Sequence, residues 1–204
     1  EFNTEFLYRK DVHNTHHLKF HYFISNVDTE IIIRNPKYLN NGTNLSGSYS
    51  KLTYQFTNES RDYIEYPLDG YYVHLEGSKY LNGSSPINHF EFLGQAEHHL
   101  ELKHRFFLGS SFKGKWSSYG YQPYFVQEGF GFDDYVRGYE YYVIDGQEFW
   151  LSKTVLKYAL IEKTNFDIPY VKMRQFNKAH YSLYLGIFSD IGYVIDNQNS
   201  EDNN

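Results

Sequence analysis

Two charged residues stand out, because Arg137 is the only basic residue of the stretch 119–146 and Asp190 is the only carboxylate of the stretch 179–195. Arg137 lies in the stretch 119–146, which is unusually long for a turn and rich in glycine and aromatic residues. Asp190 lies in the middle of the largely apolar stretch 179–195. A guanidinium can grip a carboxylate through two parallel hydrogen bonds, so the chemistry open to these two residues is charge recognition.

The segment around Asp190 alternates with the period of a β-strand. Its two faces read Leu183, Leu185, Ile187, Ser189 and Ile191 on one side, and Ser182, Tyr184, Gly186, Phe188, Asp190 and Gly192 on the other. The first face suits lipid and the second a polar interior, because a carboxylate facing hydrocarbon would be costly. A soluble β-sandwich would alternate equally well, with its apolar face turned to a core.

Other reactive residues do not form a recognisable catalytic or metal site. Seven of the ten histidines fall into two groups, His13, His16, His17 and His21, and then His98, His99 and His104. Neighbours on a strand point to opposite faces, which is poor geometry for one metal, so we expect no metal and no cofactor. The chain also lacks a Gly-X-Ser-X-Gly elbow and a His-Glu-X-X-His motif, and it is not expected to be an enzyme.

Composition favours an all-β chain. Among 204 residues there are 22 Tyr and 17 Phe but only one Met, and aromatic residues favour strands. The net charge of −6 is spread without a basic block, which argues against nucleic acid as a partner. No apolar run is long enough for a transmembrane helix, but a transmembrane strand needs apolar residues only at alternate positions.

Alternation and turn residues predict about eight strands. The predicted strands are 16–25, 29–34, 48–57, 71–76, 88–98, 103–118, 147–161 and 179–195, whereas residues 1–15 are expected to be irregular. The strands should form a curved antiparallel sheet that does not close on itself. Its outer face is expected to carry Leu52, Tyr54, Val73, Leu75, Leu183, Leu185 and Ile187.

Three motifs, in order, resemble those of the BamA/TamA-type superfamily of outer-membrane assembly and translocation barrels. Tyr66-Pro67-Leu68-Asp69-Gly70 resembles a periplasmic turn that opens a strand. Val136-Arg137-Gly138-Tyr139 is similar to the motif of a loop that folds back into the pore. Phe188-Ser189-Asp190-Ile191-Gly192-Tyr193-Val194 resembles a later strand whose Asp faces the lumen. The resemblance covers roughly residues 46–196.

The resemblance implies an antiparallel transmembrane β-barrel of roughly sixteen strands. Residues 1–204 would form one partial barrel domain from its C-terminal half, without the early strands, the last strands or the periplasmic repeat domains. Its implied function is insertion or secretion of other proteins at the bacterial outer membrane. The expected partners are outer-membrane lipid, unfolded client proteins and accessory lipoproteins.

The resemblance also assigns roles and sides. Lys157 stands where many members have a glutamate, so Asp190 is the expected partner of Arg137, with Gly192 beside it. Gly138 is expected to let the loop approach the wall closely. The connections 66–70 and 164–178 would be periplasmic, and residues 83–86, the long loop and the tail would face the cell surface.

One alternative uses the same pattern of strands. A secreted or surface β-rich binding module would need no membrane insertion, and four Asn-X-Ser/Thr sequons at Asn41, Asn44, Asn58 and Asn82 would suit it. Dependence on detergent distinguishes the two.

Overall fold

A computed structural model describes residues 1–39, 45–118, 122–131, 133–167 and 178–197. The sequons at Asn41 and Asn44 lie outside these ranges. The described elements are strands β1 (Phe2–Arg9), β2 (Asn14–Asn26), β3 (Ser46–Glu59), β4 (Gly70–Asn82), β5 (Phe90–Glu101), β6 (Phe106–Ser117), β7 (Glu148–Asp167) and β8 (Lys178–Ile195), helix α1 (Thr29–Arg34) and the 3-10 helix η1 (Tyr124–Val126).

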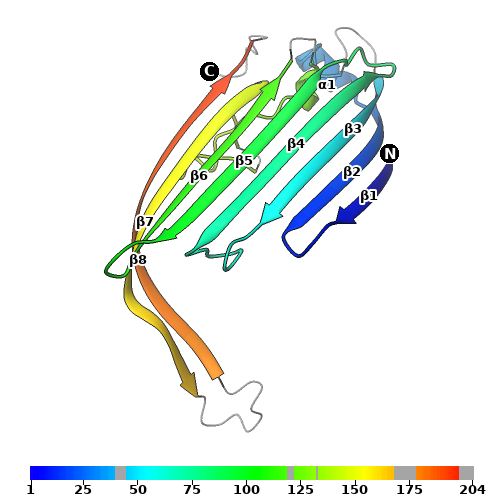
Figure 1. Ribbon diagram of the computed structural model, residues 1–204. Helices are drawn as coiled ribbons and strands as arrows, with labels where there is room; N and C mark the ends of the chain where they lie inside the picture. The colour runs from blue at the N-terminus through cyan, green and yellow to red at the C-terminus, as the bar shows by residue number, and fades with distance from the viewer. Residues whose placement is uncertain (40–44, 119–121, 132, 168–177, 198–204) are drawn as a thin grey trace.

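The strands form one antiparallel sheet in simple sequence order, from β1 to β8, as Figure 1 shows. The all-β prediction is therefore confirmed. β1 and β8 are the edges of the sheet, and within the described ranges they do not pair with each other. None of the described helices is long and apolar enough to cross a membrane.

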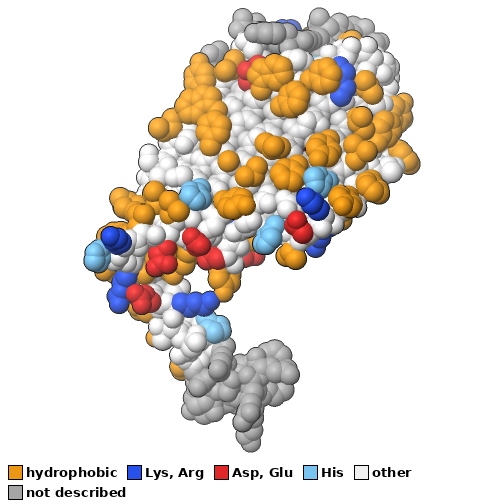
Figure 2. Space-filling view, in the orientation of Figure 1, with side chains coloured by type: hydrophobic (Ala, Val, Ile, Leu, Met, Phe, Trp, Pro, Cys, Tyr) orange, Lys and Arg blue, Asp and Glu red, His pale blue; other side chains and the backbone are white. Residues whose placement is uncertain are grey.

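Register assigns every strand residue to one of two faces, because directly paired residues point the same way. Gly94, Gly114, Trp150 and Tyr193 stand opposite one another in succession across β5 to β8. The face they share, called here the apolar face, carries the predicted outer residues. Val73 is half-buried there, and the others are exposed: Leu52, Tyr54, Leu75, Leu183, Leu185 and Ile187. Figure 2 shows hydrophobic side chains spread over the strands and charged ones gathered toward the lower end.

The opposite face, called here the polar face, carries hydroxyl, amide and charged side chains. The Thr53 and Ser78 hydroxyls lie 2.9 Å apart, and Gln55 Nε2 donates to Glu76 Oε2 over 2.6 Å. Lys51 Nζ lies 3.8 Å from the Glu76 carboxylate.

Buried side chains are found where connections cover the polar face. One cluster joins Tyr49, Tyr80 and Ile87 to Val126 of η1, and a second joins Phe130 to Phe149 and Leu151. The small hydrophobic core therefore lies under the long connection between β6 and β7, while the apolar face stays uncovered.

Two sequence-based assignments are wrong. Residues 2–9 are strand β1 rather than irregular, and every one of them pairs with β2. Side chains of these residues do alternate between two faces, but the polar residues on one face made the pattern hard to recognise in the sequence. Residues 29–34 are helix α1 rather than a strand. Asp28 caps the helix by accepting the N–H of Glu30, and Arg34 pairs with Glu30, so local capping outweighs the β-branched run of isoleucines.

The last two strands are longer than predicted. β7 continues to Asp167, so Thr164–Asp167 of the predicted connection 164–178 is strand, and residues 168–177 lie outside the described ranges. The register between β7 and β8 shifts near Ile161. Past the pair of Phe106 with Tyr158, where β6 begins, β7 and β8 continue as a ribbon that projects from the sheet in Figure 1.

Candidate functional site

The long connection between β6 and β7 folds back onto the polar face. It carries η1, then a short antiparallel bridge between Phe130 and Ile144. Phe125 packs against the Phe23 ring, with centroids 5.8 Å apart. The connection thus lies along the sheet instead of extending away from its end.

The predicted contact between Arg137 and Asp190 is present. Arg137 Nε donates to Asp190 Oδ2 over 2.7 Å, its backbone N–H donates to the same oxygen over 3.0 Å, and Nη2 donates to Oδ1. The guanidinium also lies 3.9 Å from the Phe188 ring centroid. The Asp190 side chain is only 2% exposed, against 31% for Arg137. Hydrogen bonding to this carboxylate raises the pKa of Arg137 above its ordinary value.

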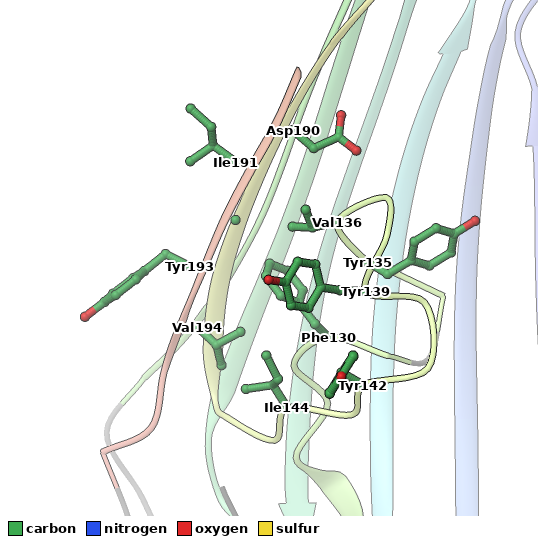
Figure 3. Close-up of a pocket in the computed structure, with 11 residues that line it drawn as sticks. Phe130, Tyr135, Val136, Tyr139, Tyr142, Ile144, Asp190, Ile191, Tyr193 and Val194 are labelled. Atoms are coloured by element: carbon green, nitrogen blue, oxygen red, sulfur yellow. The ribbon is translucent and has the colours of Figure 1, made fainter. Parts of the chain in front are cut away.

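Gly192 provides the space into which the loop packs. A Cβ atom at this position would lie 2.5 Å from the Phe130 ring and 3.0 Å from Val136. Phe188, Asp190 and Gly192 occupy alternate positions on one face of β8, so they present a ring, a carboxylate and a gap in line. Figure 3 shows Val136 and Phe130 against this part of β8.

Gly138 has a different role from the one expected. Its φ is +92°, but no atom outside its neighbours lies within 4 Å of a Cβ built there. It is therefore required for a turn and not for close approach. Its N–H donates to Glu140 Oε1 over 3.0 Å, and the Tyr139 N–H donates to the Val136 carbonyl over 2.9 Å. The close approach predicted at Gly138 takes place at Gly192.

Three lysines on the sheet also hold the loop, and they were not among the residues predicted for the site. Lys113 Nζ pairs with Asp134 Oδ2 at 2.7 Å, and Lys115 Nζ donates to the Glu128 carbonyl. Lys153, the register partner of Asp190, lies 4.7 Å from the Tyr135 ring centroid. Their inward positions in β6 and β7 were a usable signal for this role.

The connection between β3 and β4, residues 60–69, also folds onto the polar face. Asp62 Oδ1 accepts the N–H groups of Leu68 and Asp69, at 3.0 and 3.2 Å. Gly70, which opens β4, has φ +99°, and a Cβ there would lie 2.2 Å from the Ser60 carbonyl oxygen. The motif predicted to open a strand therefore does so.

Lys157 serves this turn and not the arginine of the long loop. Its Nζ donates to the Pro67 carbonyl over 2.9 Å and lies 3.7 Å from the Tyr66 ring centroid. Arg61 pairs with Glu59 at 2.6 Å and with Glu97 at 2.8 Å. Between the two inward segments lies an open cleft of about 410 Å³, lined by Arg61, Pro67 and Arg137 among others.

Several of the histidines singled out in the sequence contact separate partners. His13 contacts the Glu59 carbonyl at 2.7 Å, His16 contacts Tyr54 Oη at 2.8 Å, and His99 lies 3.4 Å from Glu97. Within the described ranges, no three His, Cys, Asp or Glu side chains form a group that could hold a metal ion.

Comparison of the chain with protein-family models gave no match, and no curated protein matches it. Its chemistry must therefore be inferred from geometry. The described arrangement is a charge clamp that positions a loop against a wall.

Proposed function

We propose that this chain is part of an outer-membrane β-barrel of the BamA/TamA type, which assists the insertion or secretion of other proteins. The strongest support is the reversed burial of the sheet. In a soluble one-sided sheet the connections cover the apolar face, but here both long connections cover the polar one.

Lipid is the occupant that fits the uncovered face. Leu185 and Ile187 on β8 are 62% and 69% exposed, and Phe92 on β5 is 52% exposed. Apolar surface this extensive is uncommon on a soluble monomer. Aromatic pairs such as Trp150 with Tyr193, 6.2 Å apart, suit a membrane interface, where one end of each side chain is wet.

The anchored loop supports the second half of the proposal. Arg137 and Asp190 place the Val136–Tyr139 turn on the face that would line a lumen, where the loop can obstruct the passage and move when a client protein engages. The mechanism needs positions and hydrogen bonds, with no bond-making step. On this proposal the protein resides in the bacterial outer membrane, with lipid, client proteins and accessory lipoproteins as partners.

Adjacent single cysteines in β8 test the membrane placement. Leu185→Cys and Ile187→Cys would carry a fluorophore on the apolar face, and Gly186→Cys would carry it on the polar face of the same strand. A Cβ at Gly186 meets only ordinary contacts, the nearest at 3.7 Å, so all three variants should fold. After reconstitution, nitroxide lipids should quench the first two strongly and the third weakly.

Equal quenching at the three positions would refute the lipid-facing assignment. A full-length protein that stays monodisperse without detergent would favour the secreted or surface binding module instead.

The assembly role is tested in cells that depend on the complete protein. Arg137→Ala should reduce the amounts of other outer-membrane or secreted proteins while its own level stays constant. Arg34→Ala is a matched control, because that arginine is 78% exposed in α1. Unchanged client levels in both would leave the barrel without the proposed role.

A further inference from the structure

One histidine is buried near the part of the sheet that the long connection between β6 and β7 covers. His89 lies in the connection between β4 and β5, directly before β5, and it is only 1% exposed. Its ring stacks on Tyr80, with centroids 4.3 Å apart and planes at 16°. Among the residues that the structure describes, neither ring nitrogen of His89 has a hydrogen-bond partner. A polar group buried in this way is uncommon and calls for a physical explanation.

The charges that act on His89 are cationic and come from three strands: Lys51 of β3, Lys79 of β4 and Lys115 of β6. Burial, followed by these charges, lowers the pKa of His89 to about 4. The carboxylates of this region serve the lysines instead. Glu76 and Glu91 each lie 3.8 Å from Lys51 Nζ, and the carboxylate of Glu128, in the long connection, attracts Lys115. A proton on His89 would therefore be a buried charge without a counter-ion.

The turn that carries His89 is tied to the sheet by hydrogen bonds. The Ser48 N–H donates to Ser84 Oγ over 2.9 Å, and the Ser84 N–H donates to Ser48 Oγ over 3.0 Å. The Ser85 N–H donates to the Ser48 carbonyl, and the Tyr80 N–H donates to the His89 carbonyl, both over 3.0 Å. Moving the imidazole out with its own turn would break these bonds.

The segment 122–131 of the long connection covers the ring on which His89 stacks, and it rests there through packing of side chains. Val126 packs with Tyr80 and Ile87 in one buried cluster. The Phe125 ring centroid lies 5.8 Å from that of Tyr49. A covering segment of this kind opens locally at a lower free energy than paired strands do. Lifting it would bring water to Tyr80 and to the imidazole stacked on that ring.

We propose that His89 is an acid-sensitive latch for the segment 122–131, which covers the sheet while the imidazole is neutral and lifts when the imidazole takes up a proton. Opening gives the protonated ring water as its hydrogen-bond partner and exposes aromatic rings on the polar face. The latch needs only the sheet and its cover, so it depends neither on the membrane placement nor on the contact of Arg137 with Asp190.

The direction of the pH effect follows from the burial of the imidazole. With the cover closed the pKa of His89 is about 4, whereas an imidazole in water titrates near about 6.5. Opening therefore takes up a proton. The stability of the cover is fully present above about pH 6.5 and is lost as the pH falls from there towards about 4.

Hydrogen exchange on the full-length protein in detergent micelles measures this opening. The Val126 and Gln127 N–H groups each donate a hydrogen bond of 3.0 Å within the segment, in a single turn that does not persist alone. Their protection factors, which correct for the pH dependence of exchange itself, should fall about twentyfold between about pH 6 and pH 4.5. Those of Leu68 and Asp69 should stay nearly constant, because Asp62, which holds them, keeps its charge down to about pH 4.

Two substitutions remove the titrating group and keep the site filled. His89→Phe retains a ring on Tyr80, and His89→Gln retains a polar side chain. Protection of the segment 122–131 should be independent of pH in both variants. His98→Phe is the matched control, because His98 is exposed on the apolar face of β5. This variant should show the same twentyfold fall as the unmodified protein.

Three outcomes would overturn the proposal. An equal fall in His89→Phe would assign the effect to carboxyl groups, an equal fall at Leu68 and Asp69 would mean that acid loosens the whole sheet, and a constant protection factor in the unmodified protein would mean that there is no latch. The imidazole can also be observed directly in protein labelled with ¹³C at histidine. The signal that His89→Phe removes should titrate well below the ordinary value, and a midpoint at or above about 6.5 would show that the site accepts the proton.

Discussion

Two segments fold onto the polar face from opposite ends of the sheet, and each is held by an arginine on a carboxylate. In the long loop, Arg137 reaches Asp190, a residue 53 positions away in sequence. In the connection 60–69, Arg61 pairs with Glu59, only two positions away, and also with Glu97.

Because of this difference in sequence distance, the 60–69 turn forms largely with its own hairpin, whereas the long loop docks on strands that are distant in sequence. Much of the 60–69 turn is held within the β3–β4 hairpin, because Glu59, Asp62 and Gly70 all belong to it, and Glu97 of β5 and Lys157 of β7 add further contacts. The long loop contacts Lys113 and Lys115 of β6 and Lys153 of β7, but its arginine finds its carboxylate only after β8 has joined the sheet. We infer that the loop can leave the wall while the sheet stays folded, whereas loosening the turn weakens the sheet itself.

The largest effect is expected from Arg61→Ala. The arginine side chain is 10% exposed, that of Glu97 is 14% exposed, and the guanidinium lies 4.5 Å from the Tyr72 ring centroid. Its removal leaves two carboxylates close together and should lower the free energy of unfolding by about 3 kcal/mol. Urea unfolding in detergent measures this. Arg61→Lys keeps the charge but loses the planar guanidinium, so its free energy of unfolding should lie between those of the unmodified protein and Arg61→Ala. If Arg61→Ala loses no more stability than the exposed Arg34→Ala, Arg61 does not stabilise the turn as described.

Arg137→Ala and Asp190→Ala should instead act on the loop. Each should weaken its docking by about 1–3 kcal/mol, because the pair is only partly dry, and should leave the urea midpoint nearly unchanged. Hydrogen exchange of the amides in 133–144 should rise in both. The double variant should be little worse than either single one, as expected for two residues that act through one contact. Effects that add would show that the two residues work separately.

Substitutions at two glycines separate the effect of limited space from the effect of backbone conformation. Gly192→Ala places a Cβ against the Phe130 ring, so the ring must move, at a cost of about 1–2 kcal/mol in loop docking. Gly138→Ala meets no atom but requires a positive φ, which costs about 1 kcal/mol. Gly186→Ala, on the same face of β8, should be neutral. Phe130→Ala should relieve the Gly192 variant only, and relief of both would mean that the two positions share one cause.

The sequence contained most of the fold because strand alternation is a local property. The assignment of Leu185 and Ile187 to one face, and of Asp190 to the other, needed only neighbouring residues. The contact of Arg137 with Asp190 was predictable because Arg137 is the only basic residue of the stretch 119–146 and Asp190 is the only carboxylate of the stretch 179–195. Helix α1 was missed because three isoleucines outweighed the N-cap signal of Asp28 in the sequence pattern.

The rest of the site depends on contacts that no local pattern encodes. The fit of Phe130 over Gly192 and the bond from Lys115 to the Glu128 carbonyl need the path of the loop over the sheet. The contact between the Tyr66 and Tyr184 rings exists because β7 and β8 continue past the pair of Phe106 with Tyr158, where β6 begins, and because the turn that carries Tyr66 lies against them. These are consequences of register and tertiary packing, so they can be seen only in the folded structure.

The smallest expected effect is a pH dependence of the two carboxylates that accept backbone N–H groups in the two inward segments, Asp62 and Glu140. Burial tends to raise the pKa of Asp62, but the N–H groups of Leu68 and Asp69 outweigh it and hold that pKa below its ordinary value. In the long loop, the Gly138 N–H lowers the pKa of Glu140. A carboxyl with a depressed folded pKa contributes stability that is fully present above its unfolded pKa, about 4, and is lost as pH falls through the folded value. The amide proton shifts of Leu68 and Asp69 should therefore titrate with a midpoint below about 4. Asp62→Asn keeps an acceptor oxygen and should make both shifts independent of pH, while leaving the Gly138 shift to titrate with Glu140. A midpoint at or above the ordinary value for Asp62 would mean that its carboxylate does not hold the turn, and the local character assigned to that segment would then rest on Arg61 alone.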